Sequence, residues 1–182
     1  MRPFVLYWAA SYGDAMRNPA EARRALVYCL AFGLVWLALA AAPAGAQQGL
    51  ATFDRDNLIL ARADGTEQAF AIELALTPRQ QAQGLMYRPS LAPDAGMLFV
   101  YRPARVVTMW MKNTVIPLDM LFIAEDGVVV KVVERTVPLS LTTISSGERV
   151  RAVLELNGGT ASRLGIRPGD RVVHPAFDED GR

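Results

Sequence analysis

Residues 106–135 read VVTMWMKNTVIPLDMLFIAEDGVVVKVVER, a stretch in which β-branched and other apolar residues predominate. Three apolar runs within it are separated by polar or turn-forming residues: 106–111, 118–124 and 128–135. A further run rich in branched residues follows at 150–156. Helical periodicity is missing throughout, so this region is predicted to form four short strands.

The region before it carries strand signals as well. Apolar residues alternate with others over 58–62 and 68–76, and residues 63–65 between them are typical of a turn, so a hairpin is predicted. The apolar run 97–101 predicts another strand, which residues 102–105 separate from the run at 106–111.

Two short helices are predicted between the strands. Residues 77–80 have the sequence form of a capping box, with proline at the first helical position, so a helix is expected to run from Pro78 to about Met86. Thr160 is expected to cap a one-turn helix that ends at Leu164, with Gly165 as its left-handed stop. A last short strand is predicted at 171–173.

Seven or eight short strands with two small helices predict a mostly β fold, because short strands must stack two faces to bury their side chains. We expect a β-sandwich or a jelly-roll-like, partly closed barrel. It forms a single domain over residues 55–175, preceded by a flexible segment at 47–54 and followed by an acidic C-terminal tail at 176–182.

The N-terminal region reads as a targeting signal. An uncharged apolar run at 25–42 follows Arg23 and Arg24 and precedes the small residues 44–46, which predicts a signal peptide over 1–46. Met16 is an alternative start, and the arginine pair also resembles a twin-arginine signal. The protein is therefore expected to be exported to the periplasm or beyond; if the run is retained, the alternative is a membrane anchor.

Composition limits the partners. Nineteen basic and eighteen acidic residues give a net charge of +1 without long runs of one sign, so no nucleic acid partner is expected. The single cysteine, Cys29, lies in the apolar run, and His174 is the single histidine, so neither a disulfide nor structural zinc is expected. Five methionines could suggest a Cu(I) carrier, but we expect them to fill the core, with no metal or cofactor. They are Met86, Met97, Met109, Met111 and Met120.

The polar residues that interrupt the apolar runs are the candidates for a site. One interpretation is a solvated turn at 112–114 that Asp119 braces. The other is a ligand-binding pocket with apolar walls and a few converging polar groups. Its residues would be Met86, Arg88, Met111, Lys112, Asn113 and Asp119. In that pocket Lys112 and Arg88 would contact anionic or hydroxyl groups, and Asp119 would hold the two cations in place.

Enzymatic alternatives are few. Asp119 and Glu155 lie on predicted strands and could act as acid and base on a glycan if their separation suits. A serine triad would need His174, and no G-x-S-x-G elbow is present. Trp110 could stack on a sugar, although a lone aromatic residue on a strand usually packs in a core.

Several motifs together resemble a known family. They are Thr77-Pro78 with Gln81 and Gly84-Leu85-Met86-Tyr87-Arg88, then Gly96-Met97-Leu98-Phe99, Trp110-Met111-Lys112-Asn113-Thr114, Ile116-Pro117-Leu118-Asp119, Val153-Leu154-Glu155 and Gly169-Asp170. In this order they resemble the family called domain of unknown function 192, over about residues 55–174. The resemblance implies a compact, mostly β, jelly-roll-like domain that is often exported, and it attaches no substrate or catalytic residue.

These observations predict an exported binding or accessory module of the cell envelope. Its expected ligand is a small polar or glycan-like molecule or an envelope protein. The alternatives are an envelope polysaccharide hydrolase that uses the carboxylate pair and a purely structural interaction domain.

Overall fold

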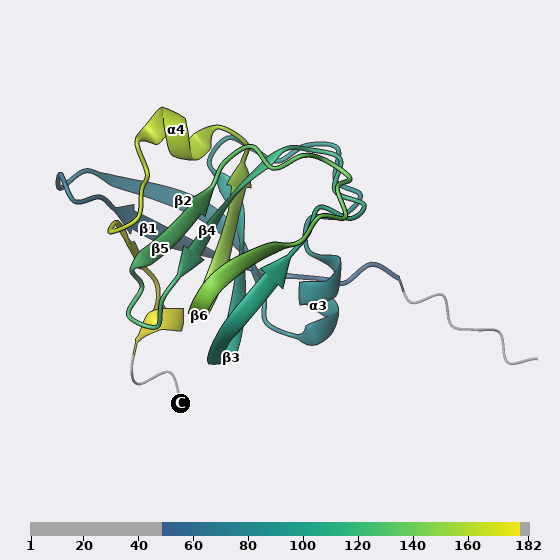
Figure 1. Cartoon of the computed structure of the whole chain (residues 1–182), viewed down its shortest axis with the longest axis horizontal. Coiled ribbons are helices and arrows are strands. Elements are labelled where there is room, and N and C mark those ends of the chain that lie inside the picture. Colours follow the sequence, from purple (N-terminus) through teal and green to yellow (C-terminus); the bar gives the residue numbers. More distant parts are fainter. Residues whose placement is uncertain (1–48, 179–182) are drawn as a thin grey trace, which may run out of the picture. The chain divides into compact units, whose positions relative to one another are not determined.

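The computed structural model describes residues 49–178, which form one mostly β domain with short helices (Figure 1). The strands are β1 (Asp54–Ala61), β2 (Glu67–Ala75), β3 (Ala95–Met109), β4 (Leu118–Ile123), β5 (Val129–Val133), β6 (Ile144–Asn157) and β7 (Arg171–Val173). The helices are α3 (Pro78–Gln83), α4 (Thr160–Leu164) and the 3-10 turn η2 (Pro175–Phe177). No helix within 49–178 is long and apolar enough to cross a membrane, and the expected signal peptide lies outside the described residues.

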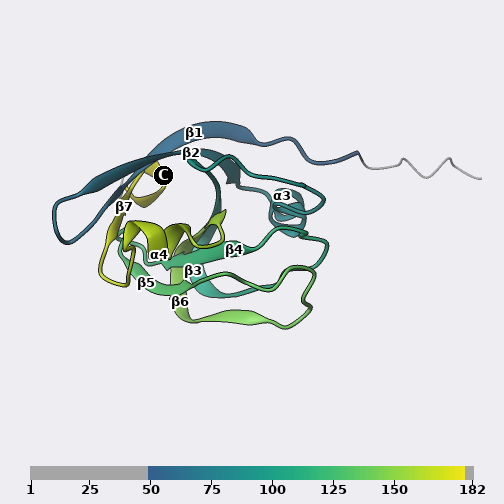
Figure 2. The same ribbon diagram turned by 90° about the horizontal axis from the view of Figure 1, so that it is seen from above.

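All seven strands belong to one sheet, in the order β5-β4-β6-β3-β2-β1-β7. The sheet curls until β7 meets the start of β5 (Figure 2). There the Val172 N–H donates to the Gly127 carbonyl at 2.8 Å, and the Val129 N–H donates to the Asp170 carbonyl at 2.8 Å. The sheet is thus a nearly closed barrel, which confirms the predicted fold class, with the barrel favoured over the sandwich.

Two apolar clusters fill the domain. All seven strands contribute to the inner cluster, which therefore occupies the barrel interior; it includes Leu58, Phe70, Leu98, Leu121, Val129, Leu154 and Val172. The outer cluster covers the other face of β3, β4 and β6; it includes Met97, Phe99, Met109, Met111, Met120, Phe122 and Val153. Successive side chains on a strand point to opposite faces. Because one apolar cluster covers each face of β4, all six of its residues are buried. Four of the five methionines lie in the outer cluster, as expected of core residues.

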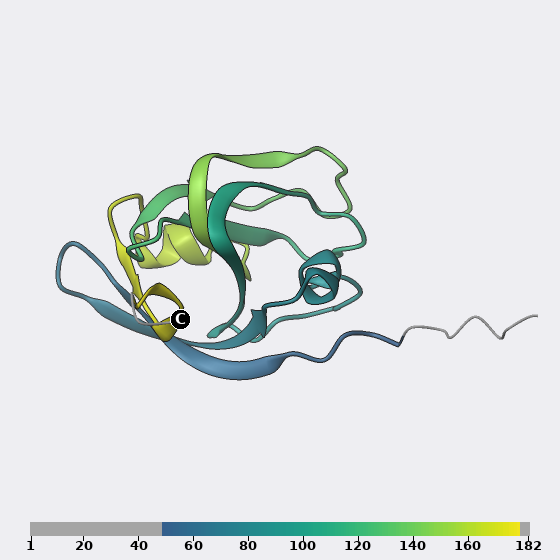
Figure 3. The same cartoon turned by 90° about the horizontal axis from the view of Figure 1, so that it is seen from below.

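Strand β3 differs from the prediction. The runs 97–101 and 106–111 were expected to form two strands, but the chain continues as one long, strongly bent strand (Figure 3). Its pairing with β6 is interrupted between Val100 and Arg105, where Pro103 has no N–H to donate. Strand β6 begins at Ile144 rather than at residue 150, because the Ser146 hydroxyl accepts from the Val107 N–H at 3.0 Å where the register shifts.

The helix predictions are confirmed with different ends. The Thr77 hydroxyl accepts from the Gln80 N–H at 3.3 Å, and the Gln80 side chain accepts from the Thr77 N–H at 2.9 Å, which completes the capping box. Helix α3 ends at Gln83 rather than Met86, because the chain leaves the helical conformation at Gly84. Gly159, not Thr160, caps α4, and Gly165 ends it in the left-handed conformation.

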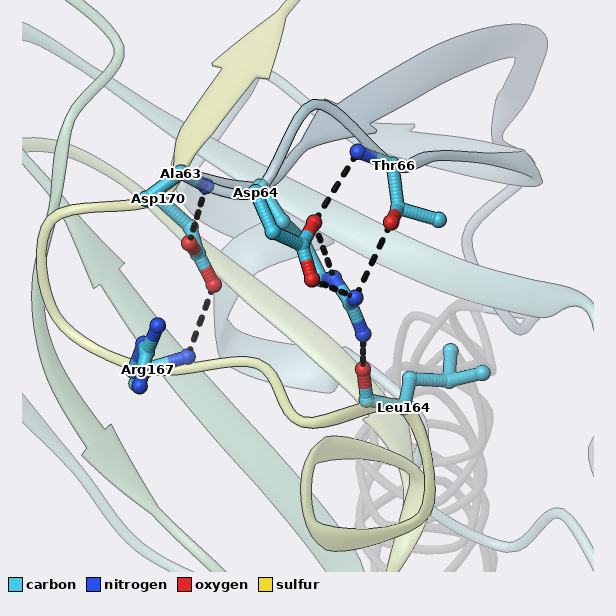
Figure 4. Close-up of polar contacts among 7 residues, drawn as sticks. Ala63, Asp64, Thr66, Leu164, Arg167 and Asp170 are labelled. Atoms are coloured by element: carbon cyan, nitrogen blue, oxygen red, sulfur yellow. Dashed lines mark hydrogen bonds and ion pairs between the residues drawn. The ribbon is translucent and has the colours of Figure 1, made fainter.

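Buried Asp170 connects the β1–β2 hairpin to the turn before β7 (Figure 4). Its carboxylate accepts from the Ala63 N–H at 3.1 Å and from the Arg167 N–H at 2.8 Å. In the same region the Arg62 guanidinium contacts Asp64 and donates to the carbonyl of Leu164, the last residue of α4. These bonds hold the short β7 in position to close the barrel, which gives Asp170 a structural role.

Candidate functional site

A site forms where β2 and β3 part. The two strands are parallel, and their pairing ends at Ala75 and Phe99. Beyond this point β2 leads into α3, and β3 continues beside β6 alone. The Gln81 side chain of α3 donates to the Val100 carbonyl at 2.8 Å and to the Ala75 carbonyl at 3.4 Å, so it bridges the diverging strands.

Three adjoining hollows follow the edge of β3 that β2 has left, and we call them together the α3 groove. The widest, about 770 Å³, reaches from Pro78 and Gln81 to Arg102 and His174. The second, about 420 Å³, runs along residues 105–110. The third, about 30 Å³, lies under the end of α3. Gln81 borders all three, while Tyr101 and Arg105 border the first two.

Glu155 of β6 borders the smallest hollow and is its one titratable lining residue. On the sheet it lies between Met97 of β3 and Met120 of β4, and its residue is only 4% exposed. The Glu155 carboxyl group forms no hydrogen bond or ion pair with a residue within 49–178. Because every fully buried side-chain oxygen and nitrogen there has a hydrogen-bond partner, the Glu155 oxygens reach the accessible space of the hollow. Burial raises the pKa of this carboxyl from 4.5 to about 8, so it is mostly protonated at neutral pH.

The hollow at Glu155 has mixed walls. Met86, Met109, Thr114 and Trp110 line it, together with the backbone that follows α3. Trp110 is 46% exposed at the surface, where the Lys112 ammonium lies 5.1 Å from its ring centroid. A volume of about 30 Å³ matches one water molecule or one small polar group of a ligand.

Tyr101 stands between the second hollow and the outer cluster. Its hydroxyl lies 3.5 Å from the Met109 sulfur, to which it donates, and the Arg105 guanidinium lies 5.0 Å from its ring centroid. Burial, and then the nearby charge of Glu155, raise the pKa of Tyr101 above its ordinary value of 10. Tyr101 therefore stays protonated, and it presents its ring to the groove.

Asp119 is a brace of the fold. It is fully buried, and its carboxylate accepts from the Arg135 N–H at 2.7 Å, the Gly159 N–H at 2.9 Å and the Ala161 N–H at 2.7 Å. The expectation that Asp119 holds the Lys112 and Arg88 cations is wrong, because backbone donors occupy it. Asp119 does not brace the turn at 112–114 either. Its hydrogen bonds hold the segments around residues 135 and 160 instead.

Three other residues predicted to line the pocket have separate environments: Arg88, Met111 and Lys112. Arg88 pairs with Glu73 of β2, and its guanidinium lies 5.5 Å from the Phe53 ring centroid. Met111 is buried, and its sulfur accepts from the Thr136 hydroxyl at 3.1 Å. Lys112 is exposed. The predicted pocket therefore does not form as expected.

Met86 and Asn113 do come together. The Asn113 amide donates to the Tyr87 hydroxyl at 2.8 Å and lies 3.8 Å from the Met86 sulfur. Asn113 and Tyr87 both have a positive φ, and the Tyr87 N–H donates to the Asn113 carbonyl at 2.9 Å. This pair joins the turn after α3 to the turn at 112–114 and so fixes one wall of the hollow at Glu155.

The structure does not bring Asp119 and Glu155 together. Glu155 is opposite Met120, and Asp119 is opposite Leu156, so the two carboxylates belong to adjacent positions of the ladder. Adjacent positions face opposite sides of a sheet. Asp119 therefore faces the inner side with Leu156, and Glu155 faces the outer side with Met120. The carboxylate-pair hydrolase has no geometric support.

His174 has a structural environment. Its Nε2 lies 3.2 Å from the Asp56 carboxylate, and its Nδ1 accepts from the Ala176 N–H at 3.0 Å. The Nδ1 atom therefore caps η2, while Nε2 faces the Asp56 carboxylate of β1. Both ring nitrogens are thus engaged in holding η2 against β1.

Sequence reasoning named Glu155 as half of a carboxylate pair and as an optional neighbour of the predicted pocket, and it missed the groove. Arg105 was considered only as a cation available to Asp119, Gln81 only as part of the family motif, and Tyr101 only as a possible helper of Trp110 in sugar stacking. The usable signal was the arrangement of one helix between two apolar strands, since ligands often bind where strands of a sheet part.

The barrel and its groove define a class: a small, mostly β domain with an unpartnered buried acid beneath a surface hollow. The chain belongs to the domain of unknown function 192 (DUF192) family, described as "Uncharacterized ACR", whose family model matches residues 59–174. This confirms the resemblance seen in the motifs. A search of curated proteins finds no match.

Two solved structures are similar. A Sinorhizobium meliloti protein designated a candidate transcription regulator is 48% identical, with a TM-score of 0.68. The match covers 70% of this chain and 99% of that one. A protein of unknown function from Novosphingobium aromaticivorans is 38% identical, with a TM-score of 0.64, and the match covers 68% of this chain and 94% of that one.

Proposed function

We propose that this protein is an exported binding module that holds a small polar ligand in the α3 groove, with one polar group of the ligand at Glu155. One observation carries the proposal: an almost buried carboxyl group, with no hydrogen-bond partner within 49–178, opens onto a hollow of about 30 Å³ that adjoins the larger hollows of the groove. Burying an unsatisfied polar group lowers stability, so such a group at a surface hollow favours a binding role over a structural one.

The walls of the α3 groove support this role. Leu74, Leu76 and Val100 supply apolar surface, while Gln81 and Arg105 supply polar groups. A mixture of apolar walls and a few polar groups is typical of ligand sites. Exposed Trp110 adds a flat face on which a sugar ring or an aliphatic chain can pack. The proposed site therefore lies beside the surface expected from the sequence and shares Met86 with it.

The regulator designation of the similar structure is not carried to this chain. A protein that neutralises several DNA phosphates needs a cluster of basic residues, and this sequence has a net charge of only +1. A small-molecule ligand fits the groove and the charge better.

A thermal-shift screen tests the proposed function. Sugars, amino acids, peptides, amines and nucleotides would be added to wild type, Glu155→Gln, Trp110→Ala and the control Glu148→Gln, an exposed position on the same strand. A ligand at a hundred times its Kd stabilises by about 2.7 kcal/mol. We expect such a ligand to raise the Tm of wild type and Glu148→Gln and to have little effect on the other two. A ligand that stabilises all four equally would contradict the proposed site.

Export is the second part of the proposal, supported by the arginine pair, the apolar run 25–42 and the small residues 44–46. Intact mass of the protein recovered from the periplasm or the medium is expected to correspond to a chain that begins near Gln47. Recovery of a full-length chain in the membrane fraction would instead support the anchored alternative.

A further inference from the structure

We infer that the hollow at Glu155 receives a primary ammonium group, so that the ligand of the α3 groove is an aliphatic amine with its chain along β3. This inference rests on the proposed function and names the chemical class of the ligand. The first support is charge: Glu155 is the one ionisable residue that lines the hollow, and it is an acid.

Within 49–178 the cations near the groove have other partners, Arg102 among them. Lys112 lies over the Trp110 ring, Arg105 lies over the Tyr101 ring, and Arg88 pairs with Glu73. None of these cations pairs with Glu155, so once the carboxyl loses its proton near pH 8 a ligand can supply the compensating positive charge. Trp110 borders the same hollow, and an indole face attracts cations.

Size and chemistry favour ammonium over other cations. A hollow of about 30 Å³ suits a compact ammonium group better than the larger, planar guanidinium group. Ca²⁺ and Mg²⁺ take six or more oxygen ligands, and no group of three or more acidic or histidine side chains able to hold a metal occurs within 49–178. A primary ammonium group is compact and donates three hydrogen bonds, for which the Glu155 carboxylate and the Thr114 hydroxyl are acceptors at the hollow.

Binding of such a cation is linked to proton release. The pKa of Glu155 is about 8, so below this pH an ammonium group can pair with Glu155 only after the carboxyl loses its proton. The affinity is therefore expected to rise with pH up to about 8 and to level off above it. Aliphatic amines themselves remain charged until pH about 10.

The groups around Glu155 leave this dependence simple. On β3, Tyr101 has a pKa above 10, and the Arg105 guanidinium lies over its ring. β4 presents Met120 and Phe122, and the end of α3 presents Gln81 and Gln83, none of which titrates. Lys112 lies at the surface over the Trp110 ring.

The experiment compares n-pentylamine, 1-pentanol and pentanoate as probes, which share an alkyl chain and differ in the head group. Their Kd values for the purified protein would be measured by NMR titration at pH 6, 7 and 8. Wild type, Glu155→Gln and the control Glu148→Gln would be compared, with circular dichroism to confirm that each is folded.

We expect wild type and Glu148→Gln to bind pentylamine at least about tenfold more tightly than pentanol at pH 8 and to bind pentanoate weakest. From pH 6 to 7 the amine affinity should rise about tenfold, as expected for the loss of one proton. In Glu155→Gln the affinity for pentylamine at pH 8 should be about tenfold lower than in wild type and should no longer depend on pH. The affinity for pentanol should stay within about twofold of the wild-type value.

The outcomes separate the two proposals. If pentanol binds the groove as tightly as pentylamine, or if the amine affinity is independent of pH, the ammonium inference is overturned and the binding groove stands. If none of the three probes shifts the signals of Trp110 and Gln81, the ammonium inference is overturned, while the α3 groove as a binding site is decided by the wider thermal-shift screen.

Discussion

Replacing Asp119 with alanine is expected to lower the free energy of unfolding by about 3 to 5 kcal/mol, the range found when a buried charged group is removed from its partners. The substitution removes both carboxylate oxygens and leaves three N–H groups without an acceptor in the interior. These belong to Arg135, Gly159 and Ala161. Gly159 caps α4 and Ala161 lies in its first turn, so losing these bonds should also loosen that helix.

Urea denaturation with hydrogen exchange at the Gly159 and Ala161 amides would measure this effect. Asp119→Asn keeps one carbonyl oxygen and should lose less stability than Asp119→Ala. Asp54→Ala, at an exposed position of β1, is the matched control and should change stability by less than about 0.5 kcal/mol. A loss below about 1 kcal/mol in Asp119→Ala would show that the carboxylate is not a structural brace.

Asp119 also shows why the candidate site could not be predicted from the sequence. A carboxylate inside an apolar strand needs partners, and the sequence offered the side chains of Lys112 and Arg88. The structure supplies backbone amides from positions 16 to 42 residues away. Every residue except proline carries the same N–H, so composition and spacing contain no signal for such partners.

The face of the sheet on which the Asp119 and Glu155 side chains lie could not be predicted from the sequence either. The sequence placed Asp119 and Glu155 on strands, and both predictions of a strand are correct. Whether their side chains share a face depends on the register of β4 against β6, and a shift of one residue would reverse the answer. The sequence of either strand alone does not define this register.

Local features were predicted because their causes are local. The capping box at Thr77 and the hairpin between β1 and β2 depend on residues a few positions apart. Gly165 ends α4 because a left-handed residue is needed there. By contrast, the continuous β3 across Pro103 results from pairing with β6, about 50 residues further along the chain. Long-range pairing overrode the local break.

Glu155→Gln is expected to stabilise the protein at and above pH 8 and to change the pH dependence of its stability. The folded-state pKa of about 8 lies above the ordinary value of 4.5, so between these values the folded protein binds a proton that the unfolded chain has lost. In wild type, this group therefore makes stability fall by about 1.4 kcal/mol per pH unit from pH 4.5 to pH 8, with no further change above. Glutamine keeps the shape and cannot ionise, so it removes this contribution.

Comparing the variant with wild type isolates the group, because every other titration is common to both proteins. The two unfolding free energies should be similar near pH 5 and differ by about 3 to 5 kcal/mol at pH 8 and above, with the variant more stable. Urea denaturation from pH 5 to 9 would measure this difference, with Glu148→Gln expected to follow wild type. Parallel curves would mean that Glu155 is solvated in the folded protein. Curves that diverge as the pH rises would mean that the protein keeps an acid beside its outer cluster although that acid lowers its stability. Such a cost is expected when the acid binds a ligand.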